Sequence, residues 1–366
     1  MLDTVDIPRS RARRGLIDRF NLEIREHMPL EQQLLVVIGG VVVGLAISSL
    51  LLVAAGVSLP DVYDEFVVEI FTNPRNISSV LDYASPLVVV GLSAAMAFKA
   101  RFWNIGIEGQ LIFGGIGATV VANYDIGPPF LRLALMAVFA ILFGMAWMAL
   151  PLFLKLKLQI NEIISTLLMN YIAFDFLLHL LYGPWKDPAS GFPNSKLYDG
   201  FEQLPMLGWQ DLNLAAVFAL VLVAGFAWLL GVSRFGFLLR FVHSNPRMAR
   251  AMGVRIGVFT LVAALASAGL AGFGGFVISA GIAGRLTQSF FVGYGFSGIL
   301  IGFLARNNPV GVVLFSLLIS ILMVAGQSLQ VFYQIPFAMV QLMQAIIVIC
   351  VAASEFFIRH RLRFVA

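Results

Sequence analysis

Long apolar stretches separated by short polar segments make up most of the chain. A helix of about 20 apolar residues crosses a bilayer core. The stretches that approach or exceed this length cover residues 34–57, 78–98, 105–123, 130–154, 162–182, 212–232, 257–281, 290–304, 309–328 and 336–353. Helices are the expected form, because a helix satisfies its own backbone hydrogen bonds in lipid and the alternating segments of a membrane β-barrel are missing. The pattern predicts an all-α bundle of about ten spans, with the third and eighth stretches as candidates for broken or re-entrant helices.

The composition indicates lipid as the solvent of this chain. Hydrophobic residues make up 60% of it and charged residues 12%, with a mean hydropathy of +0.91. Soluble domains are about 45–50% apolar and about 25% charged, so a soluble fold would leave a large apolar surface in water. The net charge of +4 comes from basic residues in the short segments between the stretches. The membrane topology explains the positions of these basic residues, so they do not indicate a nucleic-acid partner.

The distribution of Lys and Arg predicts the orientation. With the N-terminus inside and ten spans, 19 of the 24 basic residues fall in inside segments. The five outside are Arg75, Arg132, Lys186, Lys196 and Arg285. Cytoplasmic segments of membrane proteins carry such an excess of basic residues. We therefore expect a multi-pass protein of the bacterial cytoplasmic (inner) membrane, with both termini in the cytoplasm.

The alternation of apolar and polar segments predicts the boundaries of three parts of the chain. They are a cytoplasmic N-terminal arm (1–33), a transmembrane domain (34–353) and a cytoplasmic tail (354–366). The first apolar stretch is expected to stay as an anchor, because it exceeds the about 7–15 residues of a signal-peptide core. Two polar segments stand out: the Pro-rich external loop 183–211, a structured cap or a connector, and the basic cytoplasmic loop 233–256.

Motifs for catalysis and cofactor binding are missing from the sequence. The phosphate-binding loop G-x-x-x-x-G-K-[ST] does not occur, since none of the lysines follows a glycine. The four histidines are scattered without metal-ligand spacing, and no G-x-S-x-G sequence is present. The single cysteine, Cys350, lies in an apolar stretch. We expect no enzyme activity, no cofactor and no metal site, with ATP hydrolysis in separate partner chains.

Polar side chains inside the apolar stretches are the first functional candidates, because an ionised side chain at mid-membrane costs about 2.5–3.5 kcal/mol even on insertion scales. The candidates for lining a translocation path are Asn104, Glu108, Gln110, Asn170 and Asp175. Asp175 follows Asn170 by five residues, and the two are expected to project to roughly one side. Interhelix hydrogen bonds are the alternative role for these two, and a helix-start anion is the alternative for Glu108.

Small residues cluster where helices are expected to touch. Gly40 and Gly44, and Gly298 and Gly302, form G-x-x-x-G pairs, and residues 269–284 are denser still. Small side chains let helix backbones approach closely in lipid. The pattern is compatible with tight packing and with a wall of helices that slide during transport.

The loop 233–256 contains a short predicted helix. Ser244 or Asn245 can cap it, Pro246 suits its first position and Gly253 stops it. The predicted element comprises Asn245, Pro246, Arg247, Met248, Ala249, Arg250, Ala251, Met252 and Gly253. So short a helix is unstable alone and has no lipid to face, so it needs a partner. A linker that carries inside charges is the alternative.

Three segments resemble the permease subunit of a bacterial ABC importer, in the branch for simple sugars and nucleosides within the branched-chain amino acid/ribose permease-like superfamily. They are residues 97–110 (AFKARFWNIGIEGQ), 161–171 (NEIISTLLMNY) and 234–253 with its Asn245-Pro246 pair. The likeness extends over about residues 80–330, supported by the Gly-rich residues 269–284, and leaves the N-terminal arm out.

The resemblance implies a type II importer fold and a set of partners: a second permease subunit, cytoplasmic ATP-binding subunits and an external solute-binding protein. It also implies that residues 245–253 form the coupling helix that docks into a groove of the ATPase. The implied function is the path for a small polar solute, a nucleoside or a simple sugar. Residues 104–110 and Asn161-Glu162 favour a nucleoside over ribose.

Two other classes of protein remain open from the residues alone. An ion-coupled secondary transporter needs an ionisable group at mid-membrane, and Asp175 is the candidate. A structural membrane scaffold needs no polar path. The lack of an ATP-hydrolysing motif in a chain that resembles a permease favours an importer driven by a separate motor, whose external binding protein sets most of the solute specificity.

Overall fold

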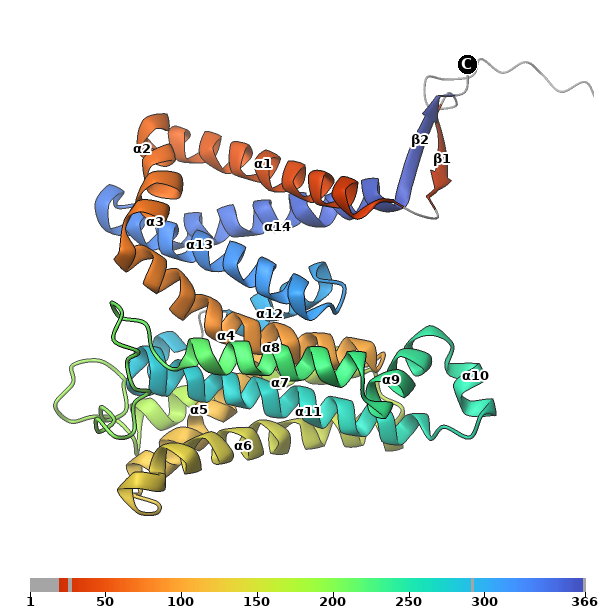
Figure 1. The fold of residues 1–366 in the computed structure, drawn as a ribbon. Coiled ribbons are helices and arrows are strands. Elements are labelled where there is room, and N and C mark those ends of the chain that lie inside the picture. The colour runs from red at the N-terminus through yellow and green to blue at the C-terminus, as the bar shows by residue number, and fades with distance from the viewer. Residues whose placement is uncertain (1–19, 26–27, 291–292, 365–366) are drawn as a thin grey trace, which may run out of the picture. The chain divides into compact units, whose positions relative to one another are not determined.

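The computed structural model describes residues 20–25, 28–290 and 293–364 of the chain. The chain forms two compact units (Figure 1). One unit joins residues 1–59 to residues 337–366, and the other comprises residues 60–336.

The first unit pairs the two ends of the chain. It contains strand β1 (Phe20–Ile24), helix α1 (Leu30–Ala54), helix α14 (Phe337–Arg359) and strand β2 (His360–Phe364). The two strands form an antiparallel ribbon in which Phe20 opposes Phe364. Outside this short ribbon the described residues form helices joined by loops, which agrees with the all-α prediction. The ribbon has no local signal in either segment, because the two segments lie far apart in the sequence.

Gly40 and Gly44 let α1 lie close to α14. A Cβ atom on Gly40 would lie 2.9 Å from the carbonyl oxygen of Cys350, and one on Gly44 would lie 2.8 Å from Cα of Ile347. A larger residue at either position would push the two helices apart. This G-x-x-x-G pair therefore serves close helix packing.

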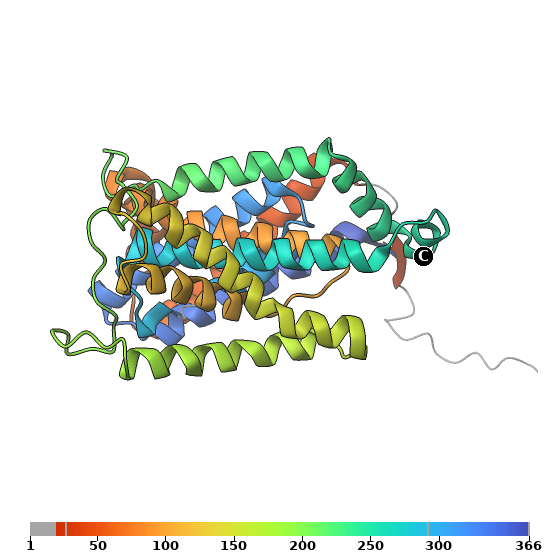
Figure 2. The same ribbon diagram turned by 90° about the horizontal axis from the view of Figure 1, so that it is seen from below.

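The second unit consists of helices joined by loops in its described residues. Its elements are α2 (Leu59–Tyr63), the π-helical turn η2 (Asp64–Val68), α3 (Glu69–Thr72), α4 (Pro74–Lys99), α5 (Ile107–Asn123), α6 (Pro129–Leu158), α7 (Glu162–Tyr182), α8 (Ala215–Gly231), α9 (Arg234–Ser244), α10 (Pro246–Ala251), α11 (Ile256–Phe276), the π-helical turn η3 (Val277–Ala283), the single turn η4 (Gln288–Phe290), α12 (Tyr294–Leu304) and α13 (Pro309–Tyr333). In Figure 2, α7 and α8 lie along opposite flanks of this unit with α11 between them.

Seven helices in the described part of the chain are long and apolar enough to cross a membrane: α1, α4, α6, α7, α11 continued by η3, α13 and α14. α8 and α9 make an eighth candidate if they count as one span bent by 69°. The predicted number of about ten is therefore not confirmed, although each predicted stretch contains a helix. The difference lies in α5 and α12, whose 17 and 11 residues are short for a full crossing.

α5 is short because the chain turns back into the bundle before it begins. Residues 100–106 are not helical, and Arg101 has a left-handed φ of 56°. Asn104 then reaches Ser267, which lies in the middle of α11. α5 consequently starts inside the bundle rather than at its end, and residues 101–106, which run back into the bundle, are called the re-entrant segment.

α11 touches α4, α5 and α6, and glycines allow these contacts. A Cβ atom on Gly272 of α11 would collide with the carbonyl oxygen of Ala140 in α6. One on Gly144 of α6 would lie 2.5 Å from the carbonyl oxygen of Ala268 in α11. The Gly-rich stretch is thus where the backbones of neighbouring helices come into direct contact.

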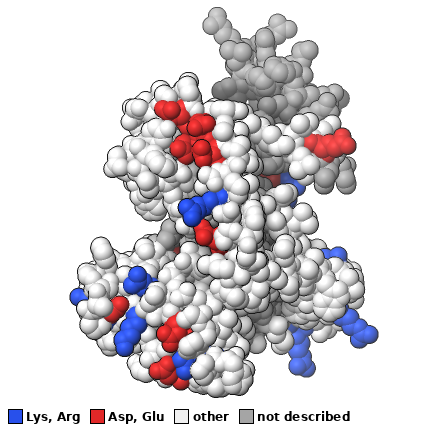
Figure 3. Space-filling view, turned by 60° about the vertical axis from the view of Figure 1, so that its left-hand side comes forward, with Lys and Arg blue, Asp and Glu red and all other residues white. Residues whose placement is uncertain are grey.

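Contacts between loops divide the second unit into two ends. At the basic end, which comprises residues 100–102, 155–161 and 232–256, Nε of Arg101 donates to the carbonyl oxygen of His243 (2.8 Å). At the loop end, which comprises residues 124–128, 183–214 and 284–290, Nε1 of Trp185 donates to the hydroxyl of Tyr124 (3.4 Å). Each contact joins two segments that the distribution of Lys and Arg predicts to lie on the same side of the membrane. Figure 3, in which the loop end comes forward, shows charged side chains as small separate groups on an otherwise uncharged surface.

Candidate functional site

A group of buried polar side chains, the polar node, joins α4, α5 and α11. Asn104 has no exposed surface, and its Nδ2 donates to Oε1 of Gln110 (2.9 Å) and to Oγ of Ser267 (3.0 Å). Nε2 of Gln110 donates back to Oδ1 of Asn104 (3.0 Å), which also accepts from the amide of Gly106 (3.1 Å). Oγ of Ser93 donates to the carbonyl oxygen of Ser267 (2.7 Å). These mutual bonds allow the polar groups to stay buried among apolar helices.

α7 is tied to the polar node through Asn170 and Thr166. Nδ2 of Asn170 donates to the carbonyl oxygen of Ile105 (2.9 Å), and its Oδ1 accepts from the amide of Gly109 (2.8 Å). Oγ1 of Thr166 accepts from the amide of Ile105 (3.2 Å). These side chains satisfy backbone groups at the start of α5, where helical partners are missing. The re-entrant segment is thereby held by two other helices, α7 and α11.

Glu108 connects α5 to α12. Its side chain is fully buried, and its Oε2 accepts from the amides of Gly295 (2.5 Å) and Phe296 (3.2 Å) in the first turn of α12. An anion is stabilised at the N-terminus of a helix. A Cβ atom on Gly295 would lie 2.6 Å from Cα of Glu108, so a glycine is needed for this approach. Glu108 therefore accepts hydrogen bonds at the start of α12 and lies in the first turn of its own helix.

Asp175 lies apart from the polar node. Its side chain is exposed, whereas that of Asn170 is 1% exposed. The expectation that the two project to one side is wrong, because five residues at 3.6 per turn differ in direction by about 140°. The structure thus brings together Asn104, Glu108, Gln110 and Asn170 of the predicted path residues and leaves Asp175 on the outer face of α7, beside the exposed Ile172 and Phe176.

The short element predicted at residues 245–253 contains the helix α10. Oδ1 of Asn245 accepts from the amide of Met248 (3.1 Å), and Pro246 occupies the first helical position. Gly253, with a φ of 81°, follows the end of the helix in the left-handed region that favours glycine. Asn245, Pro246 and Gly253 therefore have the local geometry that their types predict.

α10 presents an apolar and basic surface at the basic end. Met248 and Met252 are 53% and 66% exposed, and Arg247 and Arg250 are exposed beside them. Ala249 is buried and attaches the helix to the rest of the loop. Exposed methionines are typical of surfaces that adapt to a partner, so α10 has the character of a docking surface.

An ion triad fastens the loop 183–211 at the loop end. Nη1 of Arg132 lies 2.7 Å from Oδ1 of Asp125 and 3.0 Å from Oε1 of Glu202, and its guanidinium lies over the ring of Phe201. Arg132 and Glu202 are both buried. Since Glu202 belongs to the loop 183–211 and Arg132 to α6, the triad fixes this loop as a structured cap on the helices.

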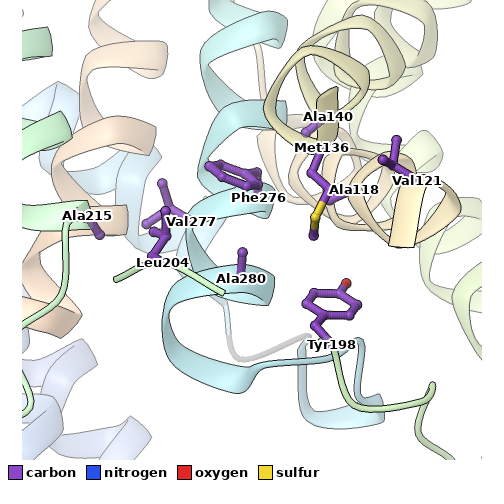
Figure 4. Close-up of a cluster of buried hydrophobic side chains, with 10 residues drawn as sticks. All are labelled: Ala118, Val121, Met136, Ala140, Tyr198, Leu204, Ala215, Phe276, Val277 and Ala280. Carbon is purple, nitrogen blue, oxygen red and sulfur yellow. The ribbon is translucent and has the colours of Figure 1, made fainter. Parts of the chain in front are cut away.

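Tyr198 anchors the same loop in the core beneath it (Figure 4). Its ring lies among Met136 of α6, Phe276 of α11 and Ala280 of η3. Its hydroxyl lies 2.6 Å from Oγ1 of Thr119 in α5. Burial raises the pKa of Tyr198 to about 12, so the hydroxyl stays neutral. The cap is thus held by a buried side chain as well as by ion pairs.

Several residues of these sites are not predicted from the sequence. Ser93, Ser267 and Thr166 lie in apolar stretches, where a lone hydroxyl is usually a packing residue. Arg132 and Glu202 lie far apart in the chain and have no local pairing pattern. A hydroxyl in the same stretch as a dense run of glycines, as at Ser267, is the one sequence signal that points to the node.

The apolar helices of the described residues, seven or eight of which are long enough to cross a membrane, define a multi-pass membrane protein. The family described as branched-chain amino acid transport system / permease component matches residues 76–352, and the chain belongs to it. It is therefore a multi-pass membrane protein with a transport role rather than an enzymatic one, as the resemblance of its segments indicates.

Three relatives are similar over most of their length. The glucose ABC transporter permease protein TsgB13 of Haloferax volcanii is 33% identical over 88% of this chain and 87% of the relative. The guanosine ABC transporter permease protein NupP of Bacillus subtilis is 28% identical over 88% of this chain and 93% of the relative. The nucleoside ABC transporter permease protein NupB of Lactococcus lactis is 25% identical over 80% and 83%.

Proposed function

We propose that the chain is the permease subunit of an ATP-driven importer for a sugar or a nucleoside. It works with a second permease subunit, cytoplasmic ATP-binding subunits and an external solute-binding protein in the bacterial inner membrane. The basic end faces the cytoplasm, as do the arm 1–33 and the tail 354–366. The names of the relatives, a glucose and a guanosine permease among them, support the solute class.

The observation that carries the proposal is the exposed helix α10. Residues 245–253 act as the coupling helix, because their methionines and arginines lie uncovered on a loop that this proposal places in the cytoplasm. The chain lacks a phosphate-binding loop, so the force for transport comes from another protein. α10 is the contact through which that force enters.

A continuous set of contacts leads from α10 to the polar node. α10 follows directly on α9, whose His243 accepts the hydrogen bond from Arg101. Arg101 begins the re-entrant segment that ends at Asn104 and Gly106 of the node. Coupling between sites travels through packed side chains and hydrogen bonds of this kind. A movement of α10 therefore shifts the start of α5, and with it α7 and α12.

The proposed translocation path uses Asn104, Glu108, Gln110, Asn170 and Asp175. In this conformation the first four are buried and bonded to other groups of the bundle, so a path along them opens when the node rearranges. Asp175 contributes from the exposed face of α7. Its burial against a second permease subunit would remove the cost of exposing a charged group to lipid.

The double substitution Arg247→Glu and Arg250→Glu is expected to abolish uptake and co-purification of the ATP-binding subunit. It reverses the charge of the proposed docking surface, and like charges across an interface cost several kcal/mol. Lys157→Glu is the matched control, since Lys157 is an exposed cation of the basic end outside α10. Measured by pull-down and by uptake in cells, unchanged assembly and transport in the double variant would remove the coupling role of α10.

Asp175→Asn distinguishes the importer from an ion-coupled carrier. The substitution removes the charge and keeps the size of the side chain. We expect uptake to keep its full dependence on ATP and to remain insensitive to a protonophore at constant ATP. A variant that loses accumulation driven by a proton gradient, while wild-type uptake continues without ATP, would favour the ion-coupled class.

A further inference from the structure

An open cavity of about 690 Å³ lies at the loop end of the second unit, between α7, the external loop and the segment after η3. Its lining includes Phe174, Phe192, Asn194, Arg285, Thr287 and Gln288. We propose that this cavity binds a neutral ring that carries several hydroxyl groups, as in a sugar or the ribose of a nucleoside. The inference rests on the proposed function and adds the place where the solute is held before it enters the bundle.

The walls of the cavity are joined by backbone hydrogen bonds. Asn194 and Thr287 pair in an antiparallel bridge. Next to them, the amide of Ser195 donates to the carbonyl oxygen of Leu286 (2.9 Å), and the amide of Leu286 donates to Oγ of Ser195 (2.9 Å). The external loop and the segment after η3 therefore form one surface. Ligand cavities are usually preformed in this way and measure about 300–1,000 Å³.

α7 supplies the third wall. Phe174 lines the cavity from this helix, and the hydroxyl of Tyr182 at its end donates to Oε1 of Gln288 (3.2 Å). This bond uses the side-chain oxygen of Gln288, so the side-chain N–H groups of Gln288 are available to a ligand. The cavity thus adjoins the helix that carries Asn170 of the polar node.

Arg285 supplies the main hydrogen-bond donors. Its guanidinium has five N–H groups in a fixed plane, and the ion pairs found among the described residues do not include it. The amide of Asn194 and the hydroxyl of Thr287 both donate and accept. Neighbouring hydroxyls on a ring, which also donate and accept, match this set.

The aromatic residues Phe174 and Phe192 supply apolar surface. Phe192 is 74% exposed on the external loop, so its ring is accessible to a ligand. An aromatic face packs against the ring carbons of a sugar or stacks on a nucleobase. A few polar groups among aromatic side chains are typical of small-molecule sites.

The charge of the lining argues against an amino acid. Among the described residues that line the cavity, none is Asp or Glu. The carboxylate of an amino acid can pair with Arg285, but its ammonium group finds no counter-charge in this lining, and a charge left unpaired on binding is costly. The cavity suits a neutral solute, although the family is described by branched-chain amino acid transport.

Direct binding to the full-length protein in lipid nanodiscs tests the inference. Tritiated glucose, guanosine and leucine are the probes, and the dissociation constant Kd is measured by scintillation proximity. We expect saturable binding of glucose or guanosine, at least tenfold tighter than that of leucine. Arg285→Ala and Phe192→Ala should each raise this Kd at least tenfold. Lys186→Ala, which removes an exposed cation of the same loop outside the lining, should leave it within twofold.

Comparison of glucose with guanosine distinguishes the two classes of solute. Tighter binding of guanosine assigns a nucleoside, and tighter binding of glucose assigns a sugar. Phe192 lies at an exposed loop position, so Phe192→Ala tests the cavity even if Arg285→Ala does not fold. An unchanged Kd in both variants overturns the inference, as does equal binding of leucine or no saturable binding of either ring. A loss of binding-protein capture in the Arg285 variant, with solute affinity intact, also overturns it. The test of α10 by ATPase co-purification is independent of this cavity, so either proposal can fail alone.

Discussion

Gly272→Ala is expected to prevent folding of the second unit, although it adds one methyl group. The new Cβ would collide with the carbonyl oxygen of Ala140 and lie 3.1 Å from Cα of Gly144. Both neighbours are backbone atoms of α6, which cannot move aside as a side-chain end can. The cost should therefore exceed the about 1–3 kcal/mol that is typical of overpacking. We expect little monodisperse protein in detergent and a large fall in the midpoint of thermal unfolding.

Gly257→Ala is the matched control on the same helix. Nothing lies within 4 Å of a Cβ at this position, and alanine is favoured over glycine in a helix by up to about 1 kcal/mol. Its yield and unfolding midpoint should equal or exceed those of the wild type. Similar behaviour of the two alanine variants would contradict the close approach of α6 and α11.

Asn104→Leu is expected to destabilise the protein strongly and to abolish uptake. It leaves the side-chain amide of Gln110 and the N–H of Gly106 buried without their partner, and each such group costs about 1–3 kcal/mol. It also releases the re-entrant segment from Ser267 of α11. Unfolding in detergent measures the first effect, and solute uptake in cells measures the second.

The double variant Asn104→Leu and Gln110→Leu distinguishes two causes of lower stability: polar groups left without a hydrogen-bond partner, and changed side-chain packing. Replacing both partners by apolar groups can be nearly neutral, so the double variant should regain part of the stability that Asn104→Leu loses. Uptake should remain absent, because the link from Arg101 to the node is not restored. If the stability lost by the double variant equals the sum of the losses of Asn104→Leu and Gln110→Leu measured singly, the two side chains do not act as one unit.

The apolar pattern predicts where helices occur, because each stretch carries its own signal. It also predicts α10, whose cap and first residue, Asn245 and Pro246, are local features. The number of spans cannot be predicted in the same way. α5 starts inside the bundle because Asn104 bonds to Ser267, and a contact between residues so far apart in the sequence is absent from the hydropathy of either stretch.

Prediction of the site is limited in the same way, because local signals can be read from the sequence and long-range contacts cannot. Asn104, Glu108 and Gln110 are predicted as important because polar groups are costly inside a membrane. Their partners are serine hydroxyls and backbone amides such as that of Gly295, which every sequence contains in abundance. Asp175 carries the same residue-type signal and lies outside the node, because residue type does not determine which face of α7 turns inward.

The proposed importer requires α10 to lie on the cytoplasmic side of the membrane, and cysteine labelling tests this placement directly. Cys350 is the single cysteine, so Cys350→Ser provides a background for single probes at Met252, Lys157 and Lys186. Spheroplasts that lack the ATP-binding subunit are treated with a membrane-impermeant maleimide, before and after permeabilisation. We predict immediate labelling of Lys186→Cys, and labelling of Met252→Cys and Lys157→Cys only after permeabilisation. Labelling of Met252→Cys in intact spheroplasts would contradict this placement.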